Sequence, residues 1–188
     1  GTLKNFTRMR ELGGSEDARR GQRLAIGPWT HGGTGVSVAG ERGFGSQASA
    51  FGLDMQEQIL RYYDYWLKGE DNGVGDERPV KIFIMSENVW RTEEKWPLER
   101  AESVNYYLHS QGRANSLAGD GRLDAQTPAL EEPPDVYVYN PIDPVPTRGG
   151  QIISDPDIYP AGVYDQRPIE ARHDVLVYTT PPLVNHTE

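Results

Sequence analysis

The chain has no cysteine among its 188 residues. This absence excludes disulfides and thiolate metal sites, and it is compatible with the cytoplasmic location that we expect. Basic residues are in the minority, since 19 Lys and Arg stand against 28 Asp and Glu, for a formal charge of −9. Nucleic acids and anionic membranes need a basic footprint, so we expect neither as a partner.

Long apolar runs and grouped histidines are lacking too. No apolar run approaches the roughly 20 residues that a membrane-spanning helix needs. The four histidines, at positions 31, 109, 173 and 186, lie far apart and show no metal-ligand spacing. With 36% hydrophobic and 25% charged residues, the composition is typical of a globular protein.

Proline is scarce in the first part of the chain. Only Pro28 of the 14 prolines precedes residue 79, whereas 15 of the 21 glycines lie at or before Gly75. Residues 1–78 carry 10 Lys and Arg against 11 Asp and Glu, and residues 79–188 carry 9 against 17. We therefore predict two domains, 1–78 and 79–188, joined near a polar, glycine-rich stretch.

The first part has the pattern helix, strand, loop, helix. Apolar residues recur at helical spacing over 3–12, before two glycines, and residues 24–26 are typical of the end of a buried strand. Ser46 is a candidate N-cap, and apolar residues from Phe51 to Leu67 predict an amphipathic helix that ends at Gly69. This order suits the last unit of an α/β sheet.

The second part has β character. Residues 79–85, 104–108, 136–139 and 175–178 are rich in β-branched and aromatic side chains and predict strands. Proline-rich connections between them favour a jelly-roll-like β-sandwich. Trp29 and Trp90, each beside a chain turn, are expected to pack at a domain junction rather than to line a pocket.

His31 stands just beyond the first predicted strand. Gly27-Pro28 punctuates that strand, which leaves His31 at its carboxyl end, where open α/β sheets bind ligands. A histidine can take and give a proton near neutral pH, although a structural loop histidine is the alternative. In α/β-hydrolases the catalytic histidine follows the last strand, after the nucleophilic serine and the acid in chain order. This order predicts His31 as the third member of such a triad.

Two local patterns imitate parts of a serine hydrolase. His31-Gly32-Gly33 is similar to the glycine-rich oxyanion loop of lipases, and Gly35 to Ala39 is similar to a relaxed nucleophile elbow around Ser37. An elbow requires a strand directly before the serine and a helix directly after it. Neither is predicted here, so a flexible loop is the favoured interpretation of Ser37.

An ordered series of motifs over nearly the whole chain resembles the cocaine esterase/X-Pro dipeptidyl-peptidase family of serine hydrolases, the CocE/NonD type, which includes acylases. The motifs are Gly27-Pro28-Trp29-Thr30-His31, Phe83-Ile84-Met85, Trp90-Arg91, Trp96-Pro97-Leu98, Tyr106-Tyr107-Leu108, Tyr139-Asn140-Pro141-Ile142-Asp143-Pro144-Val145-Pro146, Gly149-Gly150, Asp165-Gln166-Arg167-Pro168 and Asp174-Val175-Leu176-Val177-Tyr178-Thr179-Thr180. The resemblance implies that residues 1–78 are the C-terminal end of an α/β-hydrolase sheet and that 79–188 begin a jelly-roll β-sandwich domain.

The resemblance also implies an activity. His31 would be the catalytic histidine of a serine hydrolase that cleaves an ester, an amide or a peptide through an acyl-serine, with no cofactor and no metal. The serine, the acid and the oxyanion tyrosine would precede Gly1, so we expect an internal segment that is inactive alone and needs the missing parts of its own chain as partners. A homo-oligomer is compatible with the sequence. The alternative is a non-catalytic β-sandwich binding or interaction module.

Overall fold

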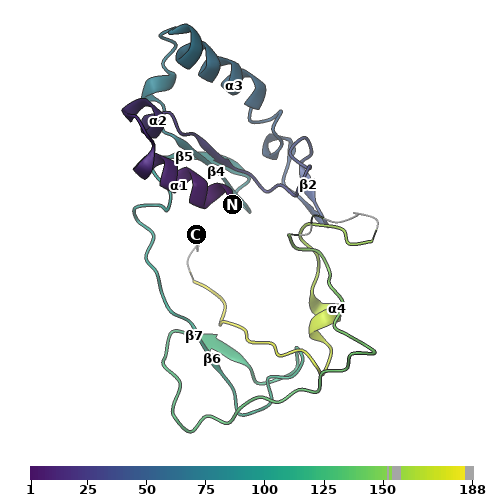
Figure 1. Cartoon of the computed structure of the whole chain (residues 1–188). Coiled ribbons are helices and arrows are strands. Elements are labelled where there is room, and N and C mark those ends of the chain that lie inside the picture. The colour runs from purple at the N-terminus through teal and green to yellow at the C-terminus, as the bar shows by residue number, and fades with distance from the viewer. Residues whose placement is uncertain (152, 154–157, 185–188) are drawn as a thin grey trace. The chain divides into compact units, whose positions relative to one another are not determined.

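The computed structural model describes residues 1–151, 153 and 158–184 of the chain. They form two compact units (Figure 1). Unit 1 consists of Gly1–Arg100 with the described part of Gly150–Val163, and unit 2 consists of Ala101–Gly149 with the described residues that follow Val163. The chain therefore leaves unit 1, builds most of unit 2, and returns once to unit 1.

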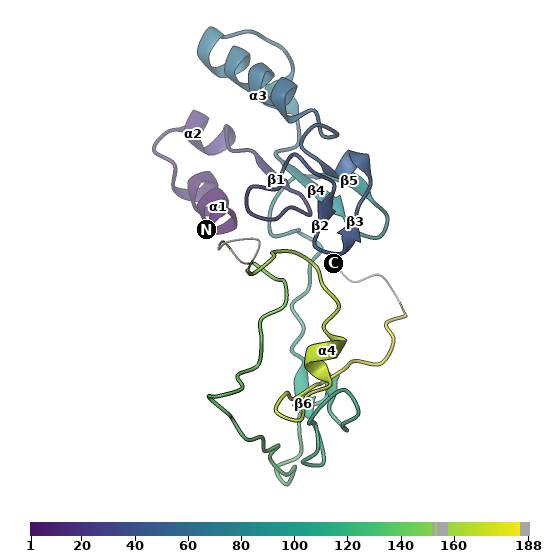
Figure 2. The same cartoon turned by 90° about the vertical axis from the view of Figure 1, so that its right-hand side faces the viewer.

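Unit 1 is built on a sheet of three strands in the order β1-β4-β5 (Figure 2). β1 (Leu24–Ile26) pairs in parallel with β4 (Val80–Ile84), and β4 pairs antiparallel with β5 (Val89–Glu93). Parallel neighbours need a long crossover connection, and here the connection contains α3 (Met55–Tyr63), which continues as a π-helical turn, η2 (Asp64–Lys68). The result is a β-α-β unit.

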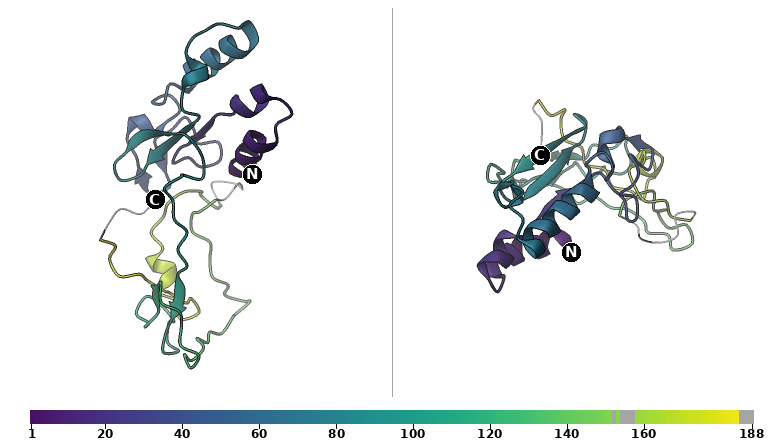
Figure 3. Two further views of the ribbon diagram at one scale, coloured as in Figure 1. Left: turned by 90° about the vertical axis from the view of Figure 1, so that its left-hand side faces the viewer. Right: turned by 90° about the horizontal axis from the view of Figure 1, so that it is seen from above.

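Side-chain alternation along the strands gives the sheet two covered faces. On one face, Leu24 and Val80 pack against Phe6 of α1 (Thr2–Leu12), and all three side chains are buried. On the other face, Lys81 meets α3, and Phe83 belongs to a second buried cluster that includes Phe44. Figure 3 shows these helices and the sheet from two further sides.

Short elements complete unit 1. They are α2 (Glu16–Arg20), the hairpin of β2 (Val38–Ala39) and β3 (Arg42–Gly43), and the 3-10 turns η1 (Ser46–Ala48) and η3 (Val74–Asp76). The returning segment joins the unit through Val163, whose N–H donates to the carbonyl of Ala39 at 3.2 Å and whose carbonyl accepts from the N–H of Glu41 at 2.8 Å.

Unit 2 has little regular structure. β6 (Tyr107–His109) pairs antiparallel with β7 (Arg122–Asp124), and α4 (Arg167–Glu170) is a single turn. Residues 175–179 pass between two segments, because the N–H of Val177 donates to the carbonyl of Ala114 at 2.8 Å and the N–H of Leu123 donates to the carbonyl of Thr179 at 3.0 Å. The protein is thus rich in small β-sheets, with one helix-covered sheet in unit 1.

Several local predictions are confirmed. The first helix, the strand at 24–26 and the helix that ends before Gly69 all occur, and the strand predicted at 79–85 occurs as β4 (Val80–Ile84). The predicted N-cap Ser46 is wrong, because Ser46 opens η1, and Asp54 in a left-handed conformation precedes α3 instead. The predicted boundary between residues 78 and 79 stays a prediction.

The predicted strand at 136–139 is also wrong. Its four apolar side chains are exposed, by 53% to 79%, and it pairs with no strand in the part of the chain that the structure describes. Alternation alone does not make a strand, since a strand needs a neighbour to satisfy its backbone groups. The predicted strand at 104–108 is shorter and shifted, as β6, and the predicted strand at 175–178 forms only an isolated bridge at Leu176, with a second bridge at the adjacent Thr179.

Candidate active site

The loop that follows β1 begins with a close approach of backbone to an aromatic ring. A Cβ placed on Gly27 would overlap the indole of Trp29, so the ring covers this glycine and no larger residue fits without displacing it. The indole N–H of Trp29 donates to the carbonyl of Ala48 in η1 at 2.6 Å. Gly27 and Trp29 therefore hold the start of the loop against η1.

His31 occupies the tip of the tight turn from Thr30 to Gly33. The N–H of Gly33 donates to the carbonyl of Thr30 at 3.0 Å, and Gly32 has a φ of 75°. This is the arrangement of a type II turn, whose third position favours glycine. The His31 side chain is exposed, and it makes no hydrogen bond or ion pair with the residues that the structure describes. It is free to act on a group presented to the turn.

A second tryptophan supports the loop from β5. The rings of Trp29 and Trp90 pack with their centroids 5.7 Å apart, and Trp90 also contacts Phe83 of β4 at 5.3 Å. The indole N–H of Trp90 donates to the carbonyl of Gln47 at 2.7 Å. As predicted, both tryptophans are packing residues, and they join elements on either side of the predicted boundary.

Ser37 does not sit on a nucleophile elbow. It lies in a bend and is followed by the short strand β2 instead of a helix. Its carbonyl accepts from the N–H of Phe44 at 2.9 Å, which ties the loop to the β2-β3 hairpin. The flexible-loop interpretation is refined accordingly, since this part of the loop has defined backbone contacts.

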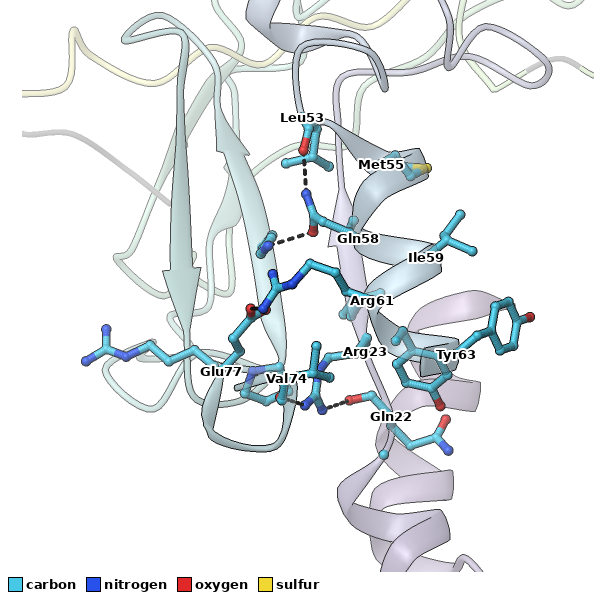
Figure 4. Close-up of a pocket in the computed structure, with 17 residues that line it drawn as sticks. Gln22, Arg23, Leu53, Met55, Gln58, Ile59, Arg61, Tyr63, Val74 and Glu77 are labelled. Atoms are coloured by element: carbon cyan, nitrogen blue, oxygen red, sulfur yellow. Dashed lines mark hydrogen bonds and ion pairs between the residues drawn. The ribbon is translucent and has the colours of Figure 1, made fainter. Parts of the chain in front are cut away.

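A hollow of about 380 Å³ lies between the sheet and α3 (Figure 4). Its charged side chains already have protein partners. Arg61 pairs with Glu77 at 2.8 Å, Lys81 donates to the side-chain carbonyl of Gln58 at 2.6 Å, and Arg23 donates to a carbonyl of η3 at 2.6 Å. Burial lowers the pKa of Lys81. This hollow is a loosely filled interface between helix and sheet, and it does not include His31.

Unit 2 contains a buried histidine that the sequence did not single out. His109 is 6% exposed, and its Nδ1 lies 2.8 Å from Glu132 Oε1. Its Nε2 lies 2.9 Å from the carbonyl of Gln126 and 3.2 Å from Asp124 Oδ1. The hydrogen bond to Glu132 is the main cause that raises the pKa of His109. The ring therefore links β6 and β7 to the segment that carries Glu132.

This arrangement predicts a pH-dependent stability. The pKa of His109 is higher in the folded state than its ordinary value of 6.5, so its stabilisation is complete below that value and is lost as pH rises through the folded-state pKa. We expect the melting temperature of the wild type to exceed that of His109→Gln by less and less as pH rises above 6.5. Thermal melts from pH 5.5 to 9 test this.

The exposed His173 provides the matched control for this pH series. His173→Gln should melt like the wild type at every pH, because the side chain of His173 forms no hydrogen bond or ion pair within the described ranges. A constant difference between wild type and His109→Gln over the whole series contradicts the prediction.

The described residues contain no group of three or more His, Asp or Glu side chains placed to hold a metal ion. His109 and its two carboxylate partners do not form a metal site, because Glu132 and Asp124 contact different nitrogens of the ring and do not converge on one point. No helix within these ranges has both the length and the apolar character required to cross a membrane.

The comparisons with known proteins place the chain in a hydrolase family. Residues 72–188 match the family described as X-Pro dipeptidyl-peptidase C-terminal non-catalytic domain. The chain belongs to this family, as the sequence motifs predicted, and residues 72–188 are its non-catalytic domain. His31, Trp29 and β1 precede the matched region, whereas β4, β5 and Trp90 lie inside it.

Two relatives share most of this chain. A cocaine esterase from Rhodococcus sp. (strain MB1 Bresler) is 36% identical over 168 residues, which are 88% of this chain and 28% of the esterase. The crystal structure of an aminopeptidase from a marine sediment archaeon, Thaumarchaeota archaeon, superposes with a TM-score of 0.59 at 28% identity and covers 86% of this chain and 25% of its own. The chain thus spans about a quarter of the length of either relative.

Proposed function

We propose that this chain contributes the catalytic histidine, His31, to a serine hydrolase that cleaves an ester or amide through an acyl-serine intermediate. The observation that carries the proposal is the position of His31 at the tip of a turn directly beyond the carboxyl end of a strand in a parallel pair. Ligands bind at this edge of α/β sheets. The exposed imidazole makes no hydrogen bond or ion pair with the residues that the structure describes, which supports a chemical role.

The surroundings of β1 support an α/β-hydrolase sheet that continues beyond this chain. β1 is an edge strand of the described sheet, so one row of its backbone groups has no neighbouring strand there. Exposed edges of this kind are normally paired or covered. Several apolar side chains of α3 and η2 are also exposed, among them Leu60 at 59% and Leu67 at 77%. We propose that the rest of the hydrolase sheet and its helices cover the edge of β1 and the apolar side chains of α3 and η2.

We propose that residues 79–188 begin the jelly-roll β-sandwich that follows the catalytic domain. The support is the family match, which begins at residue 72, together with the β6-β7 pair and the segment 175–179 that threads beside it.

In the proposed mechanism, His31 acts as general base and then as general acid. One ring nitrogen takes the proton of the attacking serine hydroxyl, which lies in the part of the protein that precedes this chain. The same nitrogen then returns the proton to the leaving alcohol or amine. A carboxylate, also supplied from outside the chain, holds the other nitrogen in the required tautomer. Water repeats the sequence to release the acid product.

The substrate class rests on the relatives. Their names, a cocaine esterase and an aminopeptidase, cover ester and amide cleavage. An acyl-serine intermediate can form from an ester or from an amide, so in the proposed mechanism His31 serves either one. We therefore propose a small ester, amide or peptide as the substrate of the full-length protein.

A covalent serine probe tests the proposal. The full-length protein that contains this chain should react with a fluorophosphonate at one serine that precedes Gly1, and the 188-residue chain alone should neither be labelled nor hydrolyse a nitrophenyl ester. The reason is that the chain has a proton acceptor but no activated nucleophile. Ser37→Ala in the full-length protein is the control and should be labelled like the wild type.

Two outcomes would count against the hydrolase. Labelling of Ser37 in the isolated chain would move the nucleophile into this segment. Absence of labelling and of ester or amide turnover in the folded full-length protein would instead favour a non-catalytic binding or interaction module, the alternative that the sequence left open.

A further inference from the structure

We propose that Trp90, a residue of the domain described as non-catalytic, is a positioning residue for His31. The inference rests on the proposed function, since it assigns a role in the catalysis that His31 performs. It starts from an observation in unit 1: the loop that presents His31 is fixed through Trp29, and Trp29 is fixed by Trp90.

The contacts form a continuous chain from β5 to the turn of His31. Trp90 stands opposite Phe83 in the β4-β5 pair, and their rings contact at 5.3 Å. The ring of Trp90 also contacts that of Trp29, with the centroids 5.7 Å apart and the ring planes tilted by 50°. Trp29 lies two residues before His31, so a displacement of the Trp29 ring moves the root of the His31 turn.

The two indole N–H groups fix the same short segment. Trp90 donates to the carbonyl of Gln47 at 2.7 Å, and Trp29 donates to the carbonyl of Ala48 at 2.6 Å. Ala48 is fully buried and belongs to the same cluster as Phe83, against which Trp90 packs. Both rings are therefore fixed in position and in orientation, which packing alone does not achieve. Phenylalanine at position 90 keeps an aromatic ring there but is smaller than the indole and loses the hydrogen bond to Gln47.

This geometry leads to a specific kinetic expectation. A triad histidine must be held close to its productive position, and an error of about 1 Å can cost about 10²-fold in rate. Trp90 lies apart from His31 in the sequence and does not belong to the His31 turn, so it has no part in substrate binding through that turn. Its loss should lower kcat and leave KM nearly unchanged.

The experiment uses the full-length protein with a nitrophenyl ester as substrate. Trp90→Phe should reduce kcat by about 10- to 100-fold with KM within about twofold of the wild type. The rate of fluorophosphonate labelling should fall by the same factor, because it reports activation of the serine. The variant is assayed well below its melting temperature, so that the folded fraction is the same in every sample.

Trp66→Phe is the matched control. Trp66 is another half-buried tryptophan of unit 1, packed on Tyr62 and Tyr65, but its indole N–H has no hydrogen-bond partner among the described residues. This substitution should leave kcat within about twofold. If Trp66→Phe and Trp90→Phe change kcat alike, Trp90 is a packing residue and the inference is wrong.

A double-mutant cycle with Trp29→Phe shows whether the effects of Trp29 and Trp90 on kcat are coupled or independent. If Trp90→Phe is poorly folded, Trp29→Phe alone still tests the inference, because it should show the same loss in kcat. Residues that act as a unit give losses that do not add. We expect the double variant to lose about as much kcat as either single variant. Additive losses overturn the inference.

His31→Gln, measured in parallel, distinguishes failure of the positioning role of Trp90 from failure of the proposed function. If His31→Gln abolishes turnover while Trp90→Phe and Trp29→Phe retain the wild-type kcat, the positioning role is wrong and the proposed function stands. If His31→Gln retains the wild-type kcat, the proposed function itself is wrong.

Discussion

Substitution of His31 by glutamine in the full-length protein should lower kcat about 10⁶-fold, which is the loss produced by removing the histidine of other serine triads. Glutamine cannot accept the serine proton, so the nucleophile stays a weakly reactive hydroxyl. The expected residual rate is that of binding and oxyanion stabilisation alone. Steady-state hydrolysis of an activated ester measures the effect.

The same substitution should leave the stability unchanged, and this contrast makes the test specific. The His31 side chain is exposed and makes no hydrogen bond or ion pair within the described residues. Exposed substitutions of this kind change the free energy of unfolding by less than about 0.5 kcal/mol. A melting temperature equal to that of the wild type, together with lost turnover, assigns a chemical role to His31.

His173→Gln serves as the control for this prediction as well. His173 is an exposed histidine of unit 2, and its substitution should retain full kcat. Turnover by His31→Gln within tenfold of the wild type contradicts the triad assignment, and a large fall in its melting temperature would show that His31 has a structural role in the intact protein.

The sequence predicted the placement of His31 because the signals that define it are local. A short apolar strand, a Gly-Pro break and a glycine directly after the histidine are neighbours in the chain, and their backbone preferences alone specify a strand followed by tight turns. The structure confirms the strand and the turn. We propose that the serine and the carboxylate of the triad belong to the part of the protein outside this chain, so no pattern within the chain describes their geometry.

The support of the histidine loop could not be predicted in the same way. β5 was missed, although Ser86 and Asn88, both with positive φ, mark the turn that leads from β4 into it. The contact between Trp29 and Trp90 depends on that hairpin, because only the pairing of Phe83 with Trp90 brings residue 90 to the face where Trp29 lies. Such a contact is tertiary, and it became visible only with the register of the strands.

The error at 136–139 has the opposite cause. Val136 and Val138 alternate with Tyr137 and Tyr139, which is the usual signature of a strand. Alternation describes a strand that has one buried face, but all four side chains are exposed in unit 2. The pattern is a local property, whereas burial and pairing depend on a neighbour that unit 2 does not provide among the described residues.

Contacts within unit 1 connect the segment that carries His31 to the non-catalytic domain. The family match begins at residue 72, between α3 and β4, yet β1 and β4 are hydrogen-bonded neighbours in one sheet. The strand that leads to the candidate catalytic histidine is therefore paired with the first strand of the non-catalytic domain. A domain without catalytic groups can still set the rate of a reaction by fixing the residue that performs it.

Gly121→Ala is expected to disrupt unit 2 severely, although it adds a single methyl group. A Cβ at Gly121 would overlap the carbonyl oxygen of Val177 and lie 2.9 Å from the Cβ of the fully buried Ala114. The added Cβ collides with backbone atoms of Val177, which cannot rotate away as a side chain can. Segment 175–179 must therefore move, and the hydrogen bond from the N–H of Val177 to the carbonyl of Ala114 is lost. Overpacking and a lost hydrogen bond together cost about 3 kcal/mol.

Amide hydrogen exchange measures this destabilisation at the contact between Ala114 and Val177. A loss of about 3 kcal/mol corresponds to a fall of about 100-fold in the protection of the amides of Ala114 and Val177, which both lie at the displaced contact. Gly43→Ala is the control, because a Cβ there meets nothing within 4 Å and the backbone conformation suits any residue. Unchanged protection in Gly121→Ala would mean that segment 175–179 does not pass beside Gly121, and the packing of this segment described for unit 2 would then be wrong.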